Sequence, residues 1–151
     1  MKRIVMLLAV ALSACSLNTT EVASVPSDPA TETFASSLNV NISQMTKTTN
    51  GTYYKDIVIG DGATLAGLPT VMISYGGFLK NGTVFDQGTI GAPGYPLSGL
   101  VFGMQEGMQG MRVHGERLIV IPSALGYGNT QGLPVPPNST IIFDVRLDQL
   151  P

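Results

Sequence analysis

Tryptophan is absent from this chain of 151 residues, and cysteine and histidine occur once each, as Cys15 and His114. A single cysteine cannot form an intramolecular disulfide, and one Cys with one His cannot build a Cys-rich zinc site or a free Cys–His catalytic pair. A serine triad would have to use His114, but the chain has no GxSxG nucleophile elbow. His114 stands in the segment MRVHGER, where we expect an exposed turn.

Charge is also scarce, since charged residues make up 12% of the chain and the formal net charge is −2. Arg112, Arg117 and Arg146 are scattered rather than clustered, so no basic surface for nucleic acid is expected. The chain contains neither a P-loop nor a dinucleotide-binding fingerprint. Asp144 and Asp148 could pair as carboxylates, but the strand pattern puts both on a face expected to be solvated. The sequence therefore offers few reagents for breaking bonds.

An export signal is expected at the N-terminus. The apolar run from Ile4 to Leu12 follows Lys2 and Arg3 and precedes small residues. It is too short for a membrane-spanning helix, which needs about 20 apolar residues, and it matches the core of a secretory signal. The tetrad LSAC that ends this segment resembles the lipobox of bacterial lipoproteins. We therefore predict a lipoprotein signal peptide over residues 1–14, the alternative being an ordinary cleaved signal that ends near a cysteine.

Under this interpretation Cys15 is lipidated and anchors an exported protein to a bacterial membrane. Ser16 after the cysteine favours the periplasmic face of the outer membrane. About half of residues 16–50 are Ser, Thr or Asn, and Pro26 and Pro29 interrupt them. Such a segment has little apolar surface to bury, so residues 15–50 are predicted to form the lipidated cysteine and a flexible tether.

The rest of the chain, residues 51–151, has the pattern of one domain with a β-sheet. Apolar and polar side chains alternate from residue 140 to 148, which predicts a half-buried strand with one solvated face. Asn81-Gly82 is a strong hairpin signal after the strand that ends near residue 80. The segments expected to form strands are TYYKDIVI, VMISYGGFLK, RLIVI and TIIFDVRLD.

Helical spacing is confined to residues 100–111, where apolar side chains recur on one face at Leu100, Val101, Met104, Met108 and Met111. The two glycines inside this segment each cost about 1 kcal/mol relative to alanine in a helix interior. Packing against the concave face of the sheet must therefore stabilise the helix, and glycine permits a close approach of backbones.

Four segments resemble the FKBP-type peptidyl-prolyl cis-trans isomerases in order and approximate spacing. They are YGGFLKNGTVFDQ, GMQEGM, GMRVHGERLIVIPSALGYG and LPVPPNSTIIFDVRL. The resemblance covers residues 51–150. It implies an α+β fold in which a five- or six-stranded antiparallel sheet wraps around one short helix, as in FKBP. It also implies a proline pocket closed by that helix.

Carried over by motif, the resemblance implies that the site consists of Tyr75, Phe85, Asp86, Val101, Met104, Tyr127 and Phe143. In that arrangement Val101 N–H and the Tyr127 hydroxyl would donate to substrate carbonyls. Further substrate contacts would come from Tyr95, Leu97, Leu100 and Val135. Two features depart from the family pattern. Met104 occupies the floor position that is usually Trp, and the loop QGLPVPPN is about one residue short, with Gln131 near a position often held by His.

The resulting hypothesis is a peptidyl-prolyl cis-trans isomerase that acts on X-Pro bonds of exported proteins and assists their folding. It needs no cofactor and no metal, takes proline-containing polypeptides as substrates, meets the membrane through Cys15 and does not bind nucleic acid. With no repeat and no long amphipathic helix, the chain is expected to be a monomer. The alternatives are a catalytically weak FKBP-like binding or chaperone module, and a purely structural lipoprotein domain with buried aromatic residues and no cleft.

Overall fold

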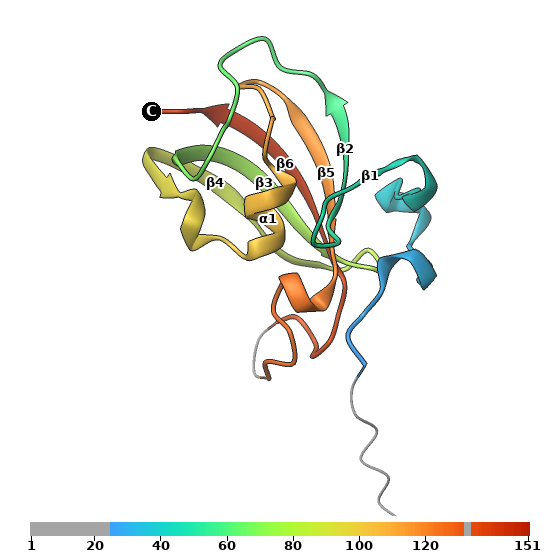
Figure 1. Cartoon of the computed structure of the whole chain (residues 1–151). Coiled ribbons are helices and arrows are strands. Elements are labelled where there is room, and N and C mark those ends of the chain that lie inside the picture. The colour runs from blue at the N-terminus through green and yellow to red at the C-terminus, as the bar shows by residue number, and fades with distance from the viewer. Residues whose placement is uncertain (1–24, 132–133) are drawn as a thin grey trace, which may run out of the picture.

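A six-stranded antiparallel sheet forms the frame of the protein in a computed structural model, which describes residues 25–131 and 134–151. The strand order is β1-β2-β5-β6-β3-β4. The strands are β1 (Thr46–Lys47), β2 (Tyr53–Val58), β3 (Thr70–Leu79), β4 (Val84–Pro96), β5 (Glu116–Ile121) and β6 (Ile141–Gln149). The sheet curves around helix α1 (Phe102–Gly107), as Figure 1 shows. The predicted fold class is confirmed, with six strands.

Short 3-10 helices occur in the segments between the strands and before β1. They are η1 (Pro29–Thr31), η2 (Ser36–Leu38), η3 (Ile42–Gln44), η4 (Leu97–Gly99) and η5 (Ser123–Leu125). Within the described residues, no helix is both long enough and apolar enough to cross a membrane.

Helix α1 is shorter than the segment with helical spacing. The regular helix ends at Gly107, and the chain changes direction at Gly110. Gly110 has φ +75°, the left-handed conformation that commonly ends a helix. Met104, Met108 and Met111 nevertheless all point into the core and are at most 3% exposed. The apolar spacing therefore identified the buried face correctly beyond the end of the helix itself.

The predicted hairpin at Asn81-Gly82 is confirmed. It joins β3 to β4, and Gly82 adopts φ +89°, which costs little without a side chain. His114 also lies in a turn, as expected, with about half of its side chain exposed and Nδ1 2.7 Å from Asp61 Oδ1.

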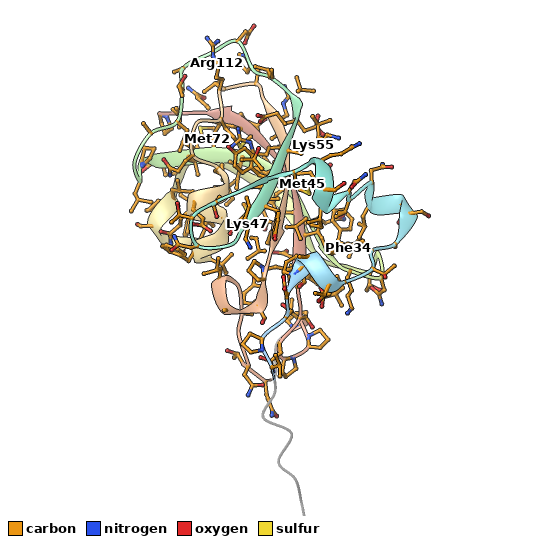
Figure 2. All side chains as sticks on the ribbon, turned by 45° about the vertical axis from the view of Figure 1, so that its right-hand side comes forward. Phe34, Met45, Lys47, Lys55, Met72 and Arg112 are labelled. Carbon is orange, nitrogen blue, oxygen red and sulfur yellow. The ribbon has the colours of Figure 1, made fainter. Side chains whose placement is uncertain are left out.

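The prediction of a flexible tether is wrong for the part of it that the structure describes. Residues 25–45, which we call the N-terminal strap, run along the convex side of the sheet (Figure 2). Leu38 is buried there, and Phe34, Val40 and Met45 pack around it. A few apolar side chains are enough to hold this polar segment because the sheet offers an apolar face to receive them.

The prediction for strand β6 also needs a correction, because the face expected to be solvated is partly covered by the strap. The alternating pattern places Ile142 on the solvated face with Asp144 and Arg146, but Ile142 is fully buried. It joins Tyr53, Leu118 and Val120 beneath the strap. The ordered unit therefore includes residues 25–50 as well as the predicted domain. The predicted signal peptide, Cys15 and Ser16 lie outside the described residues.

Candidate functional site

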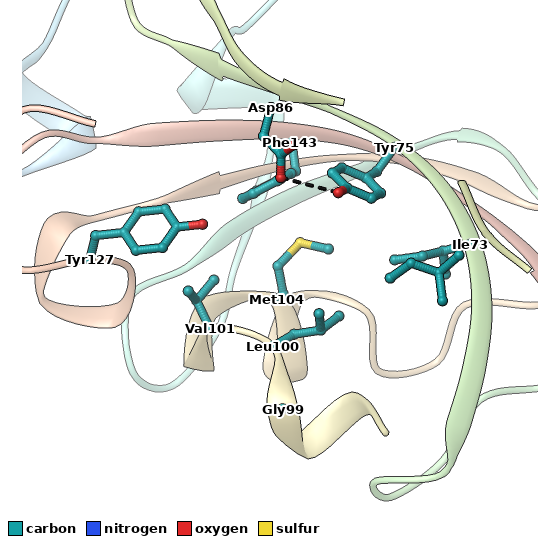
Figure 3. A pocket seen from close by; sticks show the side chains of 10 residues that line it. Ile73, Tyr75, Asp86, Gly99, Leu100, Val101, Met104, Tyr127 and Phe143 are labelled. Carbon is teal, nitrogen blue, oxygen red and sulfur yellow. Dashed lines mark hydrogen bonds between the residues drawn. The ribbon is translucent and has the colours of Figure 1, made fainter. Parts of the chain in front are cut away.

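A pocket of about 200 Å³ opens between α1 and the concave face of the sheet. Figure 3 shows side chains from opposite sides converging on it. The sheet contributes residues from β3, β4 and β6, while the other wall comes from the η4–α1 segment and from the loop after η5. The lining residues are Ile73, Tyr75, Asp86, Ile90, Gly99, Leu100, Val101, Met104, Tyr127 and Phe143.

Aromatic rings form the sheet side of the pocket. Phe143 lies with its ring centroid 6.1 Å from that of Tyr75 and 5.6 Å from that of Phe85. Phe85 in turn meets the edge of Tyr127 at 6.1 Å. Such tilted and edge-to-face pairs add stabilisation beyond the burial of their area. Gly77 makes room for them, because a Cβ there would lie 2.8 Å from Cζ of Phe85.

The floor of the pocket is Met104, which rises from α1 and is 3% exposed. Its helix comes close to β5 because Gly103 and Gly107 face Ile121 and Ile119 without side chains of their own. The close approach expected from the two glycines is thus confirmed. A methionine floor is apolar and adaptable, but it carries no hydrogen-bond donor.

Polar side chains occupy one edge of the pocket. The Tyr75 hydroxyl donates to Asp86 Oδ2 at 3.1 Å. Burial raises the pKa of Tyr75 above its ordinary value, and the hydrogen bond to Asp86 raises it further. Burial and then the charge of Asp86 also raise the pKa of Tyr127. Both hydroxyls are therefore protonated donors at neutral pH.

Val101 also lines the pocket, on the side of α1. Val101 precedes the first turn of α1, and its carbonyl accepts hydrogen bonds from the amides of Met104 and Gln105. Its own N–H has no partner among the residues that the structure describes. The side chain of Gln105 holds the backbone beside it by donating to the carbonyl of Leu100 at 2.8 Å. The lining of the pocket thus combines apolar side chains with two residues that can donate hydrogen bonds, Val101 and Tyr127.

The structure brings together most of the residues predicted for this site. Tyr75, Asp86, Leu100, Val101, Met104, Tyr127 and Phe143 line the pocket. Phe85 lies behind the lining and supports the rings of Phe143 and Tyr127.

Three of the weaker predictions do not reach the pocket. Leu97 and Val135 are buried in the core, at 0% and 2% exposure. Tyr95 is 43% exposed, and its ring covers Gly99 from outside. Tyr95 lies near the end of β4 and Leu97 begins η4, and neither is among the residues that line the cavity.

Ile73, Ile90 and Gly99 line the pocket without having been predicted. Ile73 stands two residues before Tyr75 on the same strand and so shares its face, a signal that the period of two contained. Ile90 reaches the pocket because it pairs with Ile73 across the β3–β4 ladder. That pairing depends on a register shift between Val71 and Ile73, which the sequence does not reveal.

The described residues contain no group of three His, Cys, Asp or Glu side chains placed to hold a metal ion. The pocket's own acidic group is Asp86, whose Oδ2 already accepts from Tyr75. The site is therefore suited to bind an apolar group flanked by hydrogen-bond acceptors.

Comparison with known proteins agrees with this geometry. The model of the family described as FKBP-type peptidyl-prolyl cis-trans isomerase matches residues 62–148. FK506-binding protein 4 of Rhizopus delemar is 39% identical over 108 residues, which cover 69% of this chain and 28% of that protein. FK506-binding protein 3 of Candida albicans is 44% identical over 104 residues, covering 66% and 24%. The chain thus spans about a quarter of the length of these relatives.

Solved structures show the same fold. FkpA from Escherichia coli superposes with a TM-score of 0.62 at 29% identity, covering 70% of this chain and 51% of that one. AtFKBP13 superposes with a TM-score of 0.59 at 25% identity, covering 72% and 99%. With the family model matching more than half of its residues, this chain belongs to the FKBP-type peptidyl-prolyl cis-trans isomerase family.

Proposed function

We propose that the pocket catalyses cis-trans isomerisation of X-Pro bonds in polypeptide substrates. The observation that carries the proposal is a largely apolar cavity of about 200 Å³ whose lining includes Val101 and Tyr127, two residues that can donate hydrogen bonds. A proline ring is apolar, whereas the carbonyls on either side of it need hydrogen-bond partners. The cavity is smaller than the roughly 300 Å³ at which sites for drug-sized ligands begin, which suits one residue of a chain that continues outside.

The reaction needs no bond-breaking group. Rotation about the amide removes its resonance across a barrier of about 18 to 20 kcal/mol, and the twisted amide has lost part of its charge separation. A dry aromatic pocket that binds this twisted form better than either planar isomer lowers the barrier.

Each group in the site has a role in this scheme. Met104 and Phe143 hold the proline ring, while Val101 N–H and the Tyr127 hydroxyl fix the flanking carbonyls. Asp86 accepts from Tyr75 and so holds the Tyr75 ring in place as a wall. Phe85 keeps the rings of Phe143 and Tyr127 in position.

The second candidate is a binding or chaperone module with weak catalysis. The observation that favours it is Met104, because the family usually has Trp at the pocket floor. A flexible thioether provides neither a flat surface nor an indole N–H. Such a floor could bind proline without selecting the twisted amide.

One assay separates the two candidates. The cis-to-trans rate of a series of proline tetrapeptides is measured with the full chain, with Met104→Trp and with Tyr127→Phe. An enzyme with a permissive floor is active, keeps or modestly raises its rate in Met104→Trp, and loses rate in Tyr127→Phe without losing its fold. Tyr95→Phe is the matched control, because it removes a hydroxyl outside the pocket. An inactive native chain that gains activity in Met104→Trp would support the binding module instead.

We further propose that the protein is an exported lipoprotein anchored through Cys15, with substrates among proteins that fold outside the cytoplasm. Its support is the basic start, the short apolar run and the LSAC tetrad of residues 1–15, and Ser16 favours the outer membrane. Acylation with two or more chains would tether the protein durably. X-Pro exchange takes tens to hundreds of seconds without catalysis, long enough to limit folding of such clients.

Mass spectrometry of the protein expressed in a two-membrane bacterium tests the anchor. The expected result is cleavage before Cys15 with an acyl-sized mass increase, which Cys15→Ser abolishes. Ser16→Asp should shift the protein from the outer to the inner membrane fraction. A native chain without the added mass, or one that ends elsewhere, would contradict lipidation while leaving the isomerase proposal untouched.

A further inference from the structure

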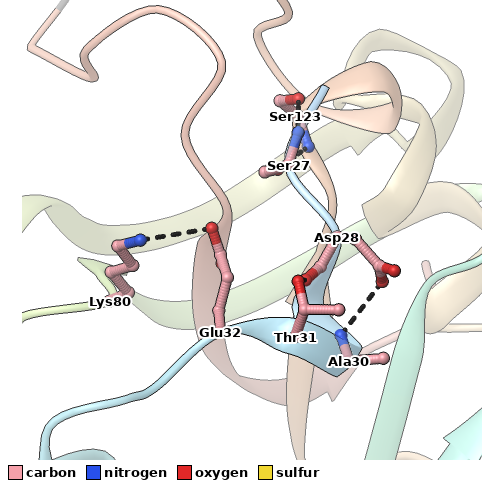
Figure 4. Close-up of polar contacts among 7 residues, drawn as sticks. All are labelled: Ser27, Asp28, Ala30, Thr31, Glu32, Lys80 and Ser123. Carbon is pink, nitrogen blue, oxygen red and sulfur yellow. Dashed lines mark hydrogen bonds and ion pairs between the residues drawn. The ribbon is translucent and has the colours of Figure 1, made fainter. Parts of the chain in front are cut away.

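The N-terminal strap is fastened to the segment that leads into Tyr127. Ser27 and Ser123 exchange two hydrogen bonds, drawn in Figure 4. The amide of Ser27 donates to Ser123 Oγ at 2.9 Å, and the amide of Ser123 donates to Ser27 Oγ at 2.8 Å. Ser123 is 1% exposed, so its amide depends on the strap for a partner.

Ser123 also organises the turn that carries Tyr127. Its carbonyl accepts hydrogen bonds from Gly126 N at 3.1 Å and from Gly128 N at 2.8 Å. These two amides lie on either side of Tyr127. Gly128 has φ +60°, so the backbone changes direction directly after the tyrosine. The position of the Tyr127 hydroxyl at the pocket therefore depends on where Ser123 is held.

Ser27 itself comes from a part of the strap that is fixed. Asp28 caps η1 by accepting at Oδ1 from the amide of Ala30, and Pro29 is buried. Farther along the strap, Glu32 Oε1 meets Lys80 Nζ at 3.2 Å (Figure 4). The Ser27 hydroxyl thus belongs to a segment that is held in place by contacts on its C-terminal side.

We propose that Ser27 is a positioning residue for Tyr127 in the isomerase site. The proposal rests on the function proposed above, in which the Tyr127 hydroxyl donates to a substrate carbonyl. Without the Ser27 hydroxyl the buried amide of Ser123 loses its acceptor, and the turn through Gly126 and Gly128 loses the anchor of its shared carbonyl. A donor displaced by about 1 Å can lose most of its effect on rate.

The test is a double-mutant cycle in the full chain, with proline tetrapeptides as substrates. Ser27→Ala should lower kcat/KM about tenfold, mainly through KM because the hydrogen bond from Tyr127 also forms in the ground state. Ser27→Thr keeps the hydroxyl and should restore most of the loss. In the Tyr127→Phe background, Ser27→Ala should cause no further loss, since the group on which it acts is gone.

Ser43→Ala is the matched control, because the Ser43 hydroxyl bonds only within the exposed strap, to Asn41 Oδ1. It should leave kcat/KM unchanged. Equal losses from Ser27→Ala with and without the Tyr127 hydroxyl would overturn the proposal, since they would mean general support of the fold.

Amide hydrogen exchange at Gly126 and Gly128 separates this proposal from the isomerase proposal. Exchange should accelerate in Ser27→Ala and not in Ser43→Ala. Unchanged exchange would refute the positioning role whatever the activity. A native chain without isomerase activity would refute the proposed function, while faster exchange in Ser27→Ala would still place the Tyr127 turn under the control of Ser27.

Discussion

At the scale of single residues, the pocket combines two tyrosine hydroxyls with one carboxylate. Asp86 accepts from Tyr75 and lies close enough to Tyr127 for its charge to raise the pKa of that hydroxyl. Burial raises the pKa of both tyrosines in the same direction. The site thus keeps its donors protonated over a wide range of pH, and no group in it has to gain or lose a proton during amide rotation.

The first prediction is a flat pH profile. Both tyrosines should remain protonated past their ordinary pKa of about 10, so kcat/KM should be constant from about pH 6 to about pH 9. The pKa values of Tyr75 and Tyr127 are raised in the folded chain, so their ionisation should not change the free energy of unfolding below about pH 10. This free energy should fall as pH rises further, because the two hydroxyls ionise more readily in the unfolded chain. Stopped-flow measurements of kcat/KM test the flat profile, and the ultraviolet absorbance of tyrosinate tests the protonation of the tyrosines. A rate that titrates near neutral pH would show that another ionising group controls the reaction.

At the scale of elements, α1 combines poor helix propensity with close packing. The six-residue helix contains two glycines, and neither could carry a methyl group without meeting β5. The close contact between α1 and β5 therefore determines the position of Met104, the floor of the pocket. The two glycines let the helix that carries Met104 approach the sheet, and contacts with the sheet stabilise that helix.

The second prediction concerns Gly107→Ala. Alanine favours a helix by about 1 kcal/mol over glycine, but its Cβ would lie 2.6 Å from Cγ2 of Ile119. Overpacking of this kind costs about 1 to 3 kcal/mol, so the variant should be less stable in spite of its better propensity. Gly91→Ala is the matched control, since nothing lies within 4 Å of a Cβ there. Urea unfolding that shows Gly107→Ala to be as stable as the native chain would rule out the close contact.

Arg117 on β5 fixes the far end of the same helix. Its side chain is 5% exposed, and Nη1 donates to the carbonyls of Gly107 at 2.9 Å and Gln109 at 2.8 Å. Nε meets Asp56 at 2.7 Å, and the guanidinium lies 4.3 Å from the centroid of the Tyr54 ring. One side chain thus joins α1, β2 and β5.

The third prediction is a large loss of stability in Arg117→Met, which keeps the apolar stem but removes every donor. The carbonyl of Gly107 would lose its donor inside the protein, and a buried acceptor left without a partner costs about 1 to 3 kcal/mol. The contacts with Asp56, whose side chain is 38% exposed, and with the Tyr54 ring add to this loss. Arg146→Met is the control, since its contact with Asp148 is a surface pair worth about 1 kcal/mol or less. Equal unfolding midpoints in the two variants would refute the bracing role of Arg117.

At the scale of the whole molecule, the sequence predicted the sheet and the pocket better than it predicted their boundaries. The hairpin at Asn81-Gly82 is a local signal that the structure confirms, whereas the alternation in β6 located the strand but did not show that Ile142 is buried. The pocket residues were found through spaced motifs, whereas Ile73 and Ile90 depend on the register of β3 with β4. Register is a long-range property, so a local pattern could not supply it.

The N-terminal strap could not be predicted for a related reason. Its composition is that of a linker, and the apolar residues Phe34, Leu38 and Val40 follow neither helical nor strand periodicity. What orders them is the apolar convex face of the sheet. The sequence did contain one sign of a cover, namely that Ile142 and Val120 are too apolar for a solvated face.

The last prediction follows from that cover. A chain that begins at residue 46 keeps every strand but uncovers Tyr53, Leu118, Val120 and Ile142. Such a contiguous apolar patch favours association, so this truncated chain should unfold at lower urea, bind a hydrophobic dye and aggregate at concentrations where a chain from residue 25 stays monomeric.

A single substitution measures the same effect without truncation. Leu38→Ala should cost about 2 to 5 kcal/mol, because Leu38 is buried between the strap and the sheet. Val25→Ala, at a side chain that is 79% exposed, should change stability by less than about 0.5 kcal/mol. If the truncated chain matched the longer one in urea midpoint and dye binding, the strap would contribute nothing to the stability of the domain. A lower midpoint would make residues 25–45 part of the folding unit that holds the pocket.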